Sequence, residues 1–243
     1  MALPNPDPNP TTAIDAVFER LLADILGGVY AAGARLPAER ELSRQLGASR
    51  PTLREALRRL GEWNLVEPRR GSGIVVRAYR DWSIEVIGGY LRYGKPEGSQ
   101  PTIGRILVDL LAVRRAMVLE VIKLTAPRVP KGGTTLARAA MARAWAMKDT
   151  PAFAREDFEI MRQIAEVAHF TPGLWLLNSL AKLWFDAASE VHFAVKPPAD
   201  YVASHSKFFD LVEDRKFDEA YTHMADYLER HDARMGQLLQ VLG

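Results

Sequence analysis

Two short helical segments joined by a tight link restrict the fold of this chain more than any other feature. The segment AERELSRQL follows Pro37, which suits the first turn of a helix, and Gly47 stands where a helix ends in the left-handed conformation. Two residues later Ser49 can cap the free amides of a new turn, and TLREALRRLGEW continues with leucines on one stripe. Two helices connected by the residues LGAS predict a helix-turn-helix.

The segments on either side of this motif complete a small domain. Upstream, apolar residues recur at helical spacing over residues 14–26, where two glycines end the pattern. Downstream, short apolar runs at residues 65–66 and 74–76 flank an RRGSG tip whose glycines permit positive φ, which is typical of a β-hairpin. We therefore expect a winged helix-turn-helix, with three helices and a β-hairpin wing, over residues 12–78, after a flexible, proline-containing lead-in at residues 1–11.

Every strong pattern after the hairpin is helical. Residues 79–101 combine a short helical pattern with a polar stretch containing Gly and Pro, so we expect a linker and connecting helix there. Residues 102–243 predict an all-α bundle of six or seven helices, with the Thr-Pro pairs at 150 and 171 marking helix starts. The predicted fold class is mostly α, with bundle helices near residues 103–126, 134–148, 151–168, 172–194, 199–214 and 217–241.

The composition excludes several classes of chemistry. The 243 residues include no cysteine, which removes disulfides, thiolate metal sites and cysteine catalysis. No uninterrupted apolar stretch approaches the roughly 20 residues of a membrane helix, and the first residues lack the pattern of a signal peptide. We expect a cytoplasmic protein without a membrane partner.

Positive charge is concentrated in the predicted helix-turn-helix and wing. Residues 35–80 contain eleven Arg, no Lys and five acids, a net charge of +6, whereas the whole chain carries +2. Arginine favours planar, bidentate contacts with phosphate or guanine. This pattern predicts a module that binds double-stranded DNA.

The second helix of a helix-turn-helix presents its N-terminal turn to base edges in the major groove, and free amides there can also hold phosphate. Arg40 on the preceding helix is expected to contact phosphate, and the basic tip of the wing is short enough to enter a minor groove. The predicted DNA contacts are Arg40, Ser49, Arg50, Pro51, Thr52, Arg54, Arg70 and Gly71.

The run LPAERELSRQLGASRPTLREALRRLGEWNLVEPRRGSGIVV resembles the winged-helix domain of the GntR superfamily of bacterial transcription regulators. The stretches LLAVRRAMVLEVI, AFAREDFEIMRQIAEVAHFTPGLWLLN and ASHSKFFDLVEDRKFDEAYTHMADYLERH are similar to the ligand-sensing domain of its FadR branch. The resemblance implies a homodimer that binds a palindromic operator, with Arg40, Arg50, Arg54 and Gly71 at the family's DNA-contacting positions. It also implies that residues 102–243 bind an effector and mediate dimerisation, and that the chain is not an enzyme.

Many members of that branch hold a divalent metal with one Asp and three His. Here Asp157 and His205 fill two of the four positions, whereas Met161 and Tyr227 stand at the other two. A thioether and a neutral phenol are poor ligands for a hard divalent ion, so we expect neither a metal nor a cofactor. His223 and His231 lie one turn either side of Tyr227, and whether either rebuilds the site stays open.

Replacing two ligands by Met and Tyr makes the centre of the bundle more apolar, which suits an extended apolar effector with a polar head. The fatty-acid-responsive regulator that gives the branch its name shares this pattern. The resemblance then implies a regulator of fatty acid metabolism that responds to a long-chain acyl-CoA or related lipid. The implied ligand-binding residues are Arg114, Asp157, Met161, Trp184, His205 and Tyr227.

Three alternatives remain. The effector could be a small carboxylate held by Arg114 and His205, with or without a metal. Met161, Trp184 and Tyr227 could be core residues, with Arg114 the buried partner of an acid. An enzyme using Asp157 and His205 as acid and base is a distant third, because no nucleophile elbow, phosphate loop or HExxH pattern occurs.

Overall fold

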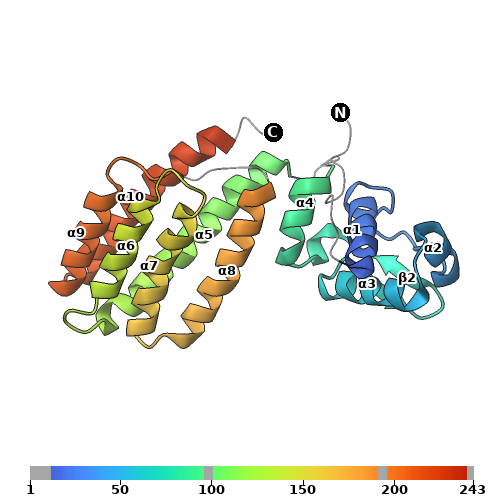
Figure 1. Ribbon diagram of the computed structural model, residues 1–243, viewed down its shortest axis with the longest axis horizontal. Coiled ribbons are helices and arrows are strands. Elements are labelled where there is room, and N and C mark those ends of the chain that lie inside the picture. The colour runs from blue at the N-terminus through green and yellow to red at the C-terminus, as the bar shows by residue number, and fades with distance from the viewer. Residues whose placement is uncertain (1–11, 96–100, 191–195, 240–243) are drawn as a thin grey trace. The chain divides into compact units, whose positions relative to one another are not determined.

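The computed structural model describes residues 12–95, 101–190 and 196–239, and it divides the chain into two compact units, Met1–Gln100 and Pro101–Gly243. The described residues form helices and one small antiparallel hairpin (Figure 1). The predicted fold class, mostly α with an N-terminal winged helix-turn-helix, is confirmed. The expected lead-in at residues 1–11 lies outside the described residues.

The first unit contains the predicted winged helix-turn-helix. Its elements are α1 (Ala13–Leu26), α2 (Glu39–Leu46), α3 (Arg50–Glu62), β1 (Val66–Arg69) and β2 (Gly73–Val76). The apolar stripes of the three helices meet in one core, in which Phe18, Leu21, Leu42, Leu53 and Leu60 are almost fully buried. This burial is what holds helices of 8 to 14 residues in place, because helices so short are marginal alone.

The turn between α2 and α3 forms as the sequence predicts. Gly47 adopts the left-handed conformation with φ of 61°, and Ser49 Oγ accepts a hydrogen bond from the Thr52 amide at 3.2 Å. One boundary is wrong: α2 begins at Glu39 with Ala38 as its N-cap, so Pro37 precedes the helix. The residue before a proline avoids helical backbone and Pro lacks an amide, which explains why Pro can stand either just inside or just before a helix start.

The hairpin has a defined register. Val66 pairs with Val76, and Arg69 pairs with Gly73 at the tip. Gly71 and Gly73 both have a φ of 77°, a conformation that favours glycine, so the RRGSG tip needs its glycines where they stand. Arg35 forms an additional antiparallel bridge to Val75. The basic tip is therefore held on a short, fixed arm.

Helix α4 (Ile87–Tyr93), from the expected connecting segment, follows two single turns of 3₁₀ helix and packs against α1. Gly89 allows the close approach, since a Cβ there would lie 2.7 Å from Leu22 Cδ2. Glu19 of α1 accepts hydrogen bonds from Arg92 Nη1 at 3.0 Å and from the Tyr93 hydroxyl at 2.9 Å. Apolar packing and these polar contacts thus fix α4 to the first unit.

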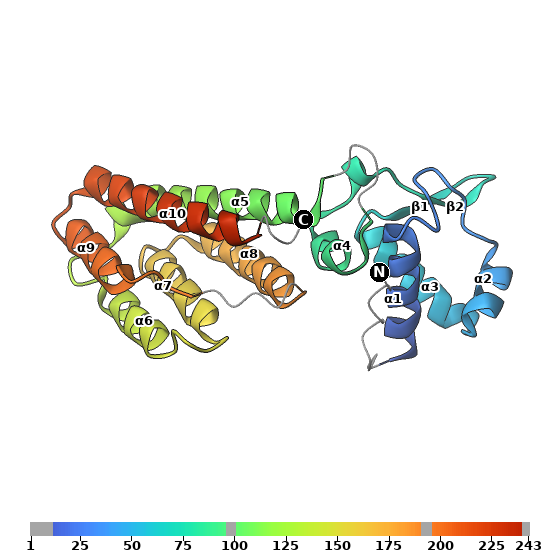
Figure 2. The same cartoon turned by 90° about the horizontal axis from the view of Figure 1, so that it is seen from above.

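The second unit is a helical bundle, as predicted. Among the described residues, α6 packs on α7, and α10 lies along both α5 and α9 (Figure 2). Two helix starts differ from the prediction: α7 follows Ala152 rather than the Thr150-Pro151 pair, and Thr171 is the first residue of its helix rather than its cap. The helices are α5 (Ile103–Thr125), α6 (Thr135–Ala146), α7 (Phe153–Val167), α8 (Thr171–Glu190), α9 (Tyr201–Glu213) and α10 (Phe217–Leu239).

The expected ends of two bundle helices, near residues 194 and 241, fall outside the described residues. Within the part of the chain that the structure describes, none of the helices combines the length and apolar character needed to cross a bilayer.

Candidate functional site

The predicted DNA contacts lie at the starts of α2 and α3 and at the tip of the hairpin. Arg40 is in the first turn of α2, Arg50 is the first residue of α3, and Arg70 is at the tip of the wing. All three side chains are exposed, and none forms an ion pair with another described residue. Three free guanidinium groups are therefore available for an anionic partner.

The remaining predicted contacts already have protein partners or serve the backbone. Ser49 and Thr52 share a hydrogen bond of 2.8 Å between their hydroxyls and together cap α3. Arg54 is exposed, but its Nε donates to Glu39 Oε2 at 2.8 Å. Pro51 and Gly71 are exposed, and the open space around Gly71 leaves room for a close backbone approach. In the sequence, Glu39 is one of five acids in a basic segment, and nothing in the spacing singles it out. Its contact with Arg54 depends on how α2 and α3 pack.

A small cavity lies inside the bundle of the second unit. Its volume is about 50 Å³, and its walls come from α5, α7, α9 and α10. Four of the six predicted ligand-binding residues line it: Arg114, Asp157, Met161 and His205. The other lining residues are apolar: Val118, Phe158, Ile160, Phe208, Met224 and Leu228. We call this space the inner cavity.

The other two predicted ligand-binding residues stand behind that wall. The Trp184 ring lies 5.5 Å from the Arg114 guanidinium carbon, a cation–π contact, and both side chains are largely buried. The Tyr227 ring packs edge-on against His205 with centroids 5.2 Å apart. Trp184 and Tyr227 therefore support the lining residues rather than line the inner cavity themselves.

Hydrogen bonds set the protonation state of His205. Its Nδ1 lies 2.8 Å from the Tyr201 carbonyl oxygen, which can only accept, so Nδ1 carries the proton. Burial lowers the pKa of His205 below its usual value, which keeps the ring neutral and leaves Nε2 as an acceptor. The Tyr201 hydroxyl donates to Asp157 Oδ1 at 2.7 Å, and burial raises the pKa of Tyr201. These contacts orient one neutral acceptor and one carboxylate at the wall of the cavity.

Arg114 is the one cation among the lining residues of the inner cavity. Its Nη2 donates to Asp232 Oδ1 at 3.0 Å, so it has the buried acidic partner that the sequence left as an alternative. Its Nε is buried and has no acceptor among the described residues. A buried donor without a partner costs roughly 1–3 kcal/mol, so this N–H favours an additional acceptor.

The donor set does not fit a divalent metal ion. Met161 and Tyr227 stand where two ligands would be needed. Burial raises the pKa of the Tyr227 phenol, which keeps it protonated and a poor ligand. His223 Nε2 donates to the Ser204 carbonyl oxygen at 2.9 Å, while His231 stacks on Tyr227. Across residues 12–95, 101–190 and 196–239, no three His, Asp or Glu side chains gather as a metal site would require.

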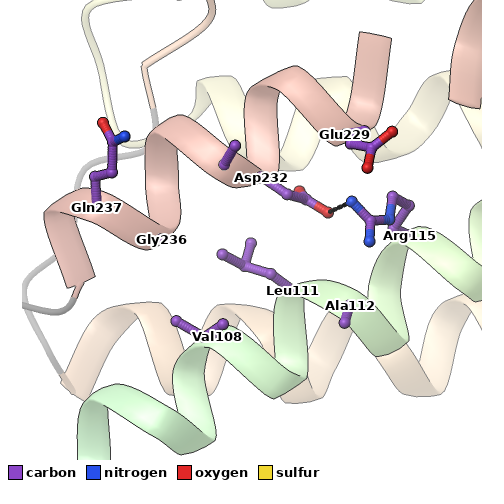
Figure 3. A pocket seen from close by; sticks show the side chains of 9 residues that line it. Val108, Leu111, Ala112, Arg115, Glu229, Asp232, Gly236 and Gln237 are labelled. Carbon is purple, nitrogen blue, oxygen red and sulfur yellow. Dashed lines mark ion pairs between the residues drawn. The ribbon is translucent and has the colours of Figure 1, made fainter. Parts of the chain in front are cut away.

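Asp232 contacts an arginine of the inner cavity and an arginine of a second, open space. A groove of about 300 Å³ runs between α5 and α10, and its walls include Leu111, Arg115 and Gly236 (Figure 3). Asp232 lies at its base with Oδ2 3.5 Å from Arg115 Nη1, while Oδ1 holds Arg114. Burial raises the pKa of Asp232 against the opposing effect of Arg114. One buried carboxylate thus holds two neighbouring arginines that face different spaces.

Comparison with known families agrees with this architecture. Residues 13–76 match the model of bacterial regulatory proteins of the gntR family, and residues 109–230, half of the chain, match the FCD domain. The chain belongs to the GntR family. Its family and fold are those of transcription regulators with an FCD domain, and not those of enzymes.

Three relatives illustrate how far the similarity of this GntR-family chain extends. The transcriptional regulator Mce2R of Mycobacterium tuberculosis is 47% identical over 66 residues, which cover 27% of this chain and 28% of the relative. The regulator Rv0494 of the same species is 33% identical over 160 residues, 65% of this chain and 59% of the relative. The fatty acid metabolism regulator protein of Pectobacterium carotovorum is 24% identical over 222 residues, 90% of this chain and 87% of the relative.

A solved structure has the same fold. Lar, described as controlling expression of the agr system of Listeria monocytogenes, has a TM-score of 0.54 at 15% identity, with 92% of this chain and 98% of that chain covered. The chain spans 28% of the length of the first curated relatives that it matches.

Proposed function

We propose that this protein is a transcription regulator that binds a pseudo-palindromic operator as a homodimer in the cytoplasm. The supporting observation is the set of free guanidinium groups of Arg40, Arg50 and Arg70 at the helix starts and the hairpin tip. The N-terminus of α3 adds free amides and a positive dipole end, which position phosphate. Two copies related by a twofold axis read two half-sites of such an operator.

The DNA-binding proposal is tested with two single variants. Arg50→Ala is expected to relax base preference, because Arg50 opens the helix that enters the major groove. Arg40→Ala is expected to weaken binding to all sequences and to lower the slope of log K against log salt by about 1. Titration of both variants with a selected and a scrambled duplex at several salt concentrations gives both quantities. Wild-type behaviour of Arg50→Ala on both duplexes would show that α3 is not the reading helix.

We further propose that the inner cavity binds an effector with an acidic head and an acyl chain, such as a fatty acid or long-chain acyl-CoA. The observation that carries this is a mostly apolar wall, with Asp157 and His205 as its other polar residues, in which Arg114 Nε lacks an acceptor. Met161 and Met224 line the wall, and their flexible thioether chains can repack to admit a chain longer than the present volume holds. The name of the Pectobacterium relative, which matches nine-tenths of this chain, is consistent with this effector class.

One observation favours a second candidate, a small carboxylate. At about 50 Å³ the inner cavity accommodates a few water molecules or a small anion without any repacking. The neutral His205 offers an acceptor for a hydroxyl group on such a molecule, while Arg114 would bind its carboxylate. Both candidates place an anionic group at Arg114 and differ in the length of the apolar part.

A series of ligands of increasing chain length separates the two candidates. Native mass spectrometry of the full chain with the carboxylates acetate, lactate, octanoate and oleate, and with the thioester oleoyl-CoA, reports which species bind and how many per chain. Affinity that rises with chain length supports the acyl effector, and affinity confined to acetate and lactate supports the small one. Loss of operator binding on adding the same ligand connects binding to regulation, since a ligand acts only through its differential affinity for the two states.

Neighbouring arginines provide matched variants for that series. Arg114→Met should weaken binding of any carboxylate roughly 10- to 100-fold, as expected for loss of a charge-assisted hydrogen bond. Arg115→Met removes the same charge one residue away, from a side chain that lines the groove between α5 and α10 instead. Equal affinity of wild type and Arg114→Met would refute the assigned head-group position.

A further inference from the structure

The contact between Glu39 and Arg54 is an ion pair that joins α2 to α3. Arg59 of α3 also forms an interhelical pair, with Asp15 of α1. Arg44 pairs with Glu41, and Arg58 pairs with Glu55 and Glu62, each within a single helix. The Glu39–Arg54 pair instead joins two helices, the first residue of α2 to the first turns of α3.

The geometry of this pair leaves part of Arg54 free. Glu39 Oε2 accepts from Nε at 2.8 Å, and no described residue accepts from Nη1 or Nη2. The two terminal nitrogens are the ones that make an end-on bidentate contact with guanine O6 and N7. Arg40, Arg50 and Arg70, by contrast, have no partner among the described residues that limits their rotamers.

We propose that Glu39 is a positioning residue that holds Arg54 for base readout, an inference that rests on the proposed DNA-binding function. A free Arg side chain loses much rotamer freedom when it binds one base, and Glu39 imposes part of that order before DNA arrives. Glu39 also prevents Arg54 from turning its Nε edge toward a neighbouring phosphate. Arg54 therefore reads sequence from the same helix as Arg50, while Arg40 supplies a contact with the backbone of the DNA.

The negative charge of Glu39 also supports a role in discrimination between DNA sequences. A carboxylate near phosphate lowers affinity for DNA of any sequence, within a screening distance of about 8–10 Å. An exposed ion pair also adds little to the stability of the fold, and here Arg54 and Glu39 are 69% and 38% exposed. An acid at this place is consequently useful where it improves discrimination between sequences.

The experiment measures discrimination and total affinity separately. The full chain selects its preferred duplex from a library with a randomised centre of about 20 base pairs, the span of two successive major-groove half-sites. Dissociation constants for that duplex and for a scrambled duplex then give a specificity ratio for wild type, Glu39→Gln, Arg54→Ala and the double variant. Glu41→Gln is the matched control, because Glu41 lies in the same helix and pairs with Arg44 at 2.7 Å.

We expect Glu39→Gln to lower the specificity ratio by about fivefold or more, the lower end for one bidentate base contact. Binding of the scrambled duplex should stay equal or become tighter, which a partly unfolded variant would not show. Arg54→Ala should lower the ratio at least as much, and adding Glu39→Gln to it should lower the ratio no further. Glu41→Gln should keep the wild-type ratio.

Three outcomes overturn the inference and can be told apart. A wild-type ratio for Glu39→Gln beside a reduced ratio for Arg54→Ala means that Arg54 reads DNA without help from Glu39, and the proposed function stands. A reduced ratio for Glu39→Gln that is equally large in the Arg54→Ala background means that Glu39 acts through some other group. Wild-type ratios for both Arg54→Ala and Arg50→Ala refute the proposed reading helix itself.

Discussion

Acid destabilisation of the bundle should depend on His231 of α10. This imidazole is largely buried against Tyr227, and its Nδ1 has no hydrogen-bond partner among the described residues. Burial, together with the nearby positive charge of Arg114, lowers the pKa of His231 to about 4. In the unfolded chain the same group titrates near its usual value of about 6.5.

The sign and size of the effect follow from that difference. Because the unfolded chain binds the proton more tightly, the contribution of His231 to the free energy of unfolding is complete above pH 6.5 and is lost as the pH falls toward 4. Between pH 7.5 and pH 5 the loss from this one group amounts to about 2 kcal/mol. Acidification below pH 4 adds only about 0.4 kcal/mol more from His231.

Urea unfolding of the full chain at pH 7.5 and pH 5, followed by circular dichroism, measures this loss. His231→Phe keeps a planar ring beside Tyr227 and removes the titrating group, so it should lose about 2 kcal/mol less than wild type over the same interval. His169→Asn is the control: it removes an exposed histidine at a position with φ of 51°, which Asn tolerates. Equal pH-dependent losses in wild type and His231→Phe would refute the assignment to His231.

Two further substitutions test local features of the fold. Gly47→Ala should lower the free energy of unfolding by about 1–2 kcal/mol, because the turn requires left-handed backbone and the space around Gly47 is open. Gly47→Asn should cost less in thermal unfolding, because Asn tolerates the left-handed conformation. Tyr201→Phe should cost about 1–3 kcal/mol, because Asp157 loses its hydroxyl partner; unchanged stability in urea would show that water replaces this bond.

The local elements of the fold could be predicted because their signals are contained in neighbouring residues. A glycine at 47, a cap at 49 and leucines at helical spacing act within one or two turns, and each of these features forms as expected. Errors occurred where two local signals compete. Pro37 and the Thr150-Pro151 pair are compatible with a helix start at more than one position, so packing of the following apolar residues decides which start is used.

Part of the candidate site was also accessible from the pattern. Asp157 and Met161 are four residues apart on one helix and therefore share a face, and both line the inner cavity with Arg114 and His205. The positions of Trp184 and Tyr227 behind the lining residues depend on how several helices rotate about their axes, which spacing along one helix does not determine.

The kinds of element, their order and the concentration of arginine in the winged helix follow from the amino-acid sequence, because periodicity, caps and charge are properties of short segments. Which opposite charges meet depends on how the helices pack. Asp232 holds Arg114 across 118 positions, and Glu39 holds Arg54 across 15. Such pairs form between helices whose packing is set by apolar burial, and a chain with 32 basic and 30 acidic residues offers far too many possible partners for spacing to select among them.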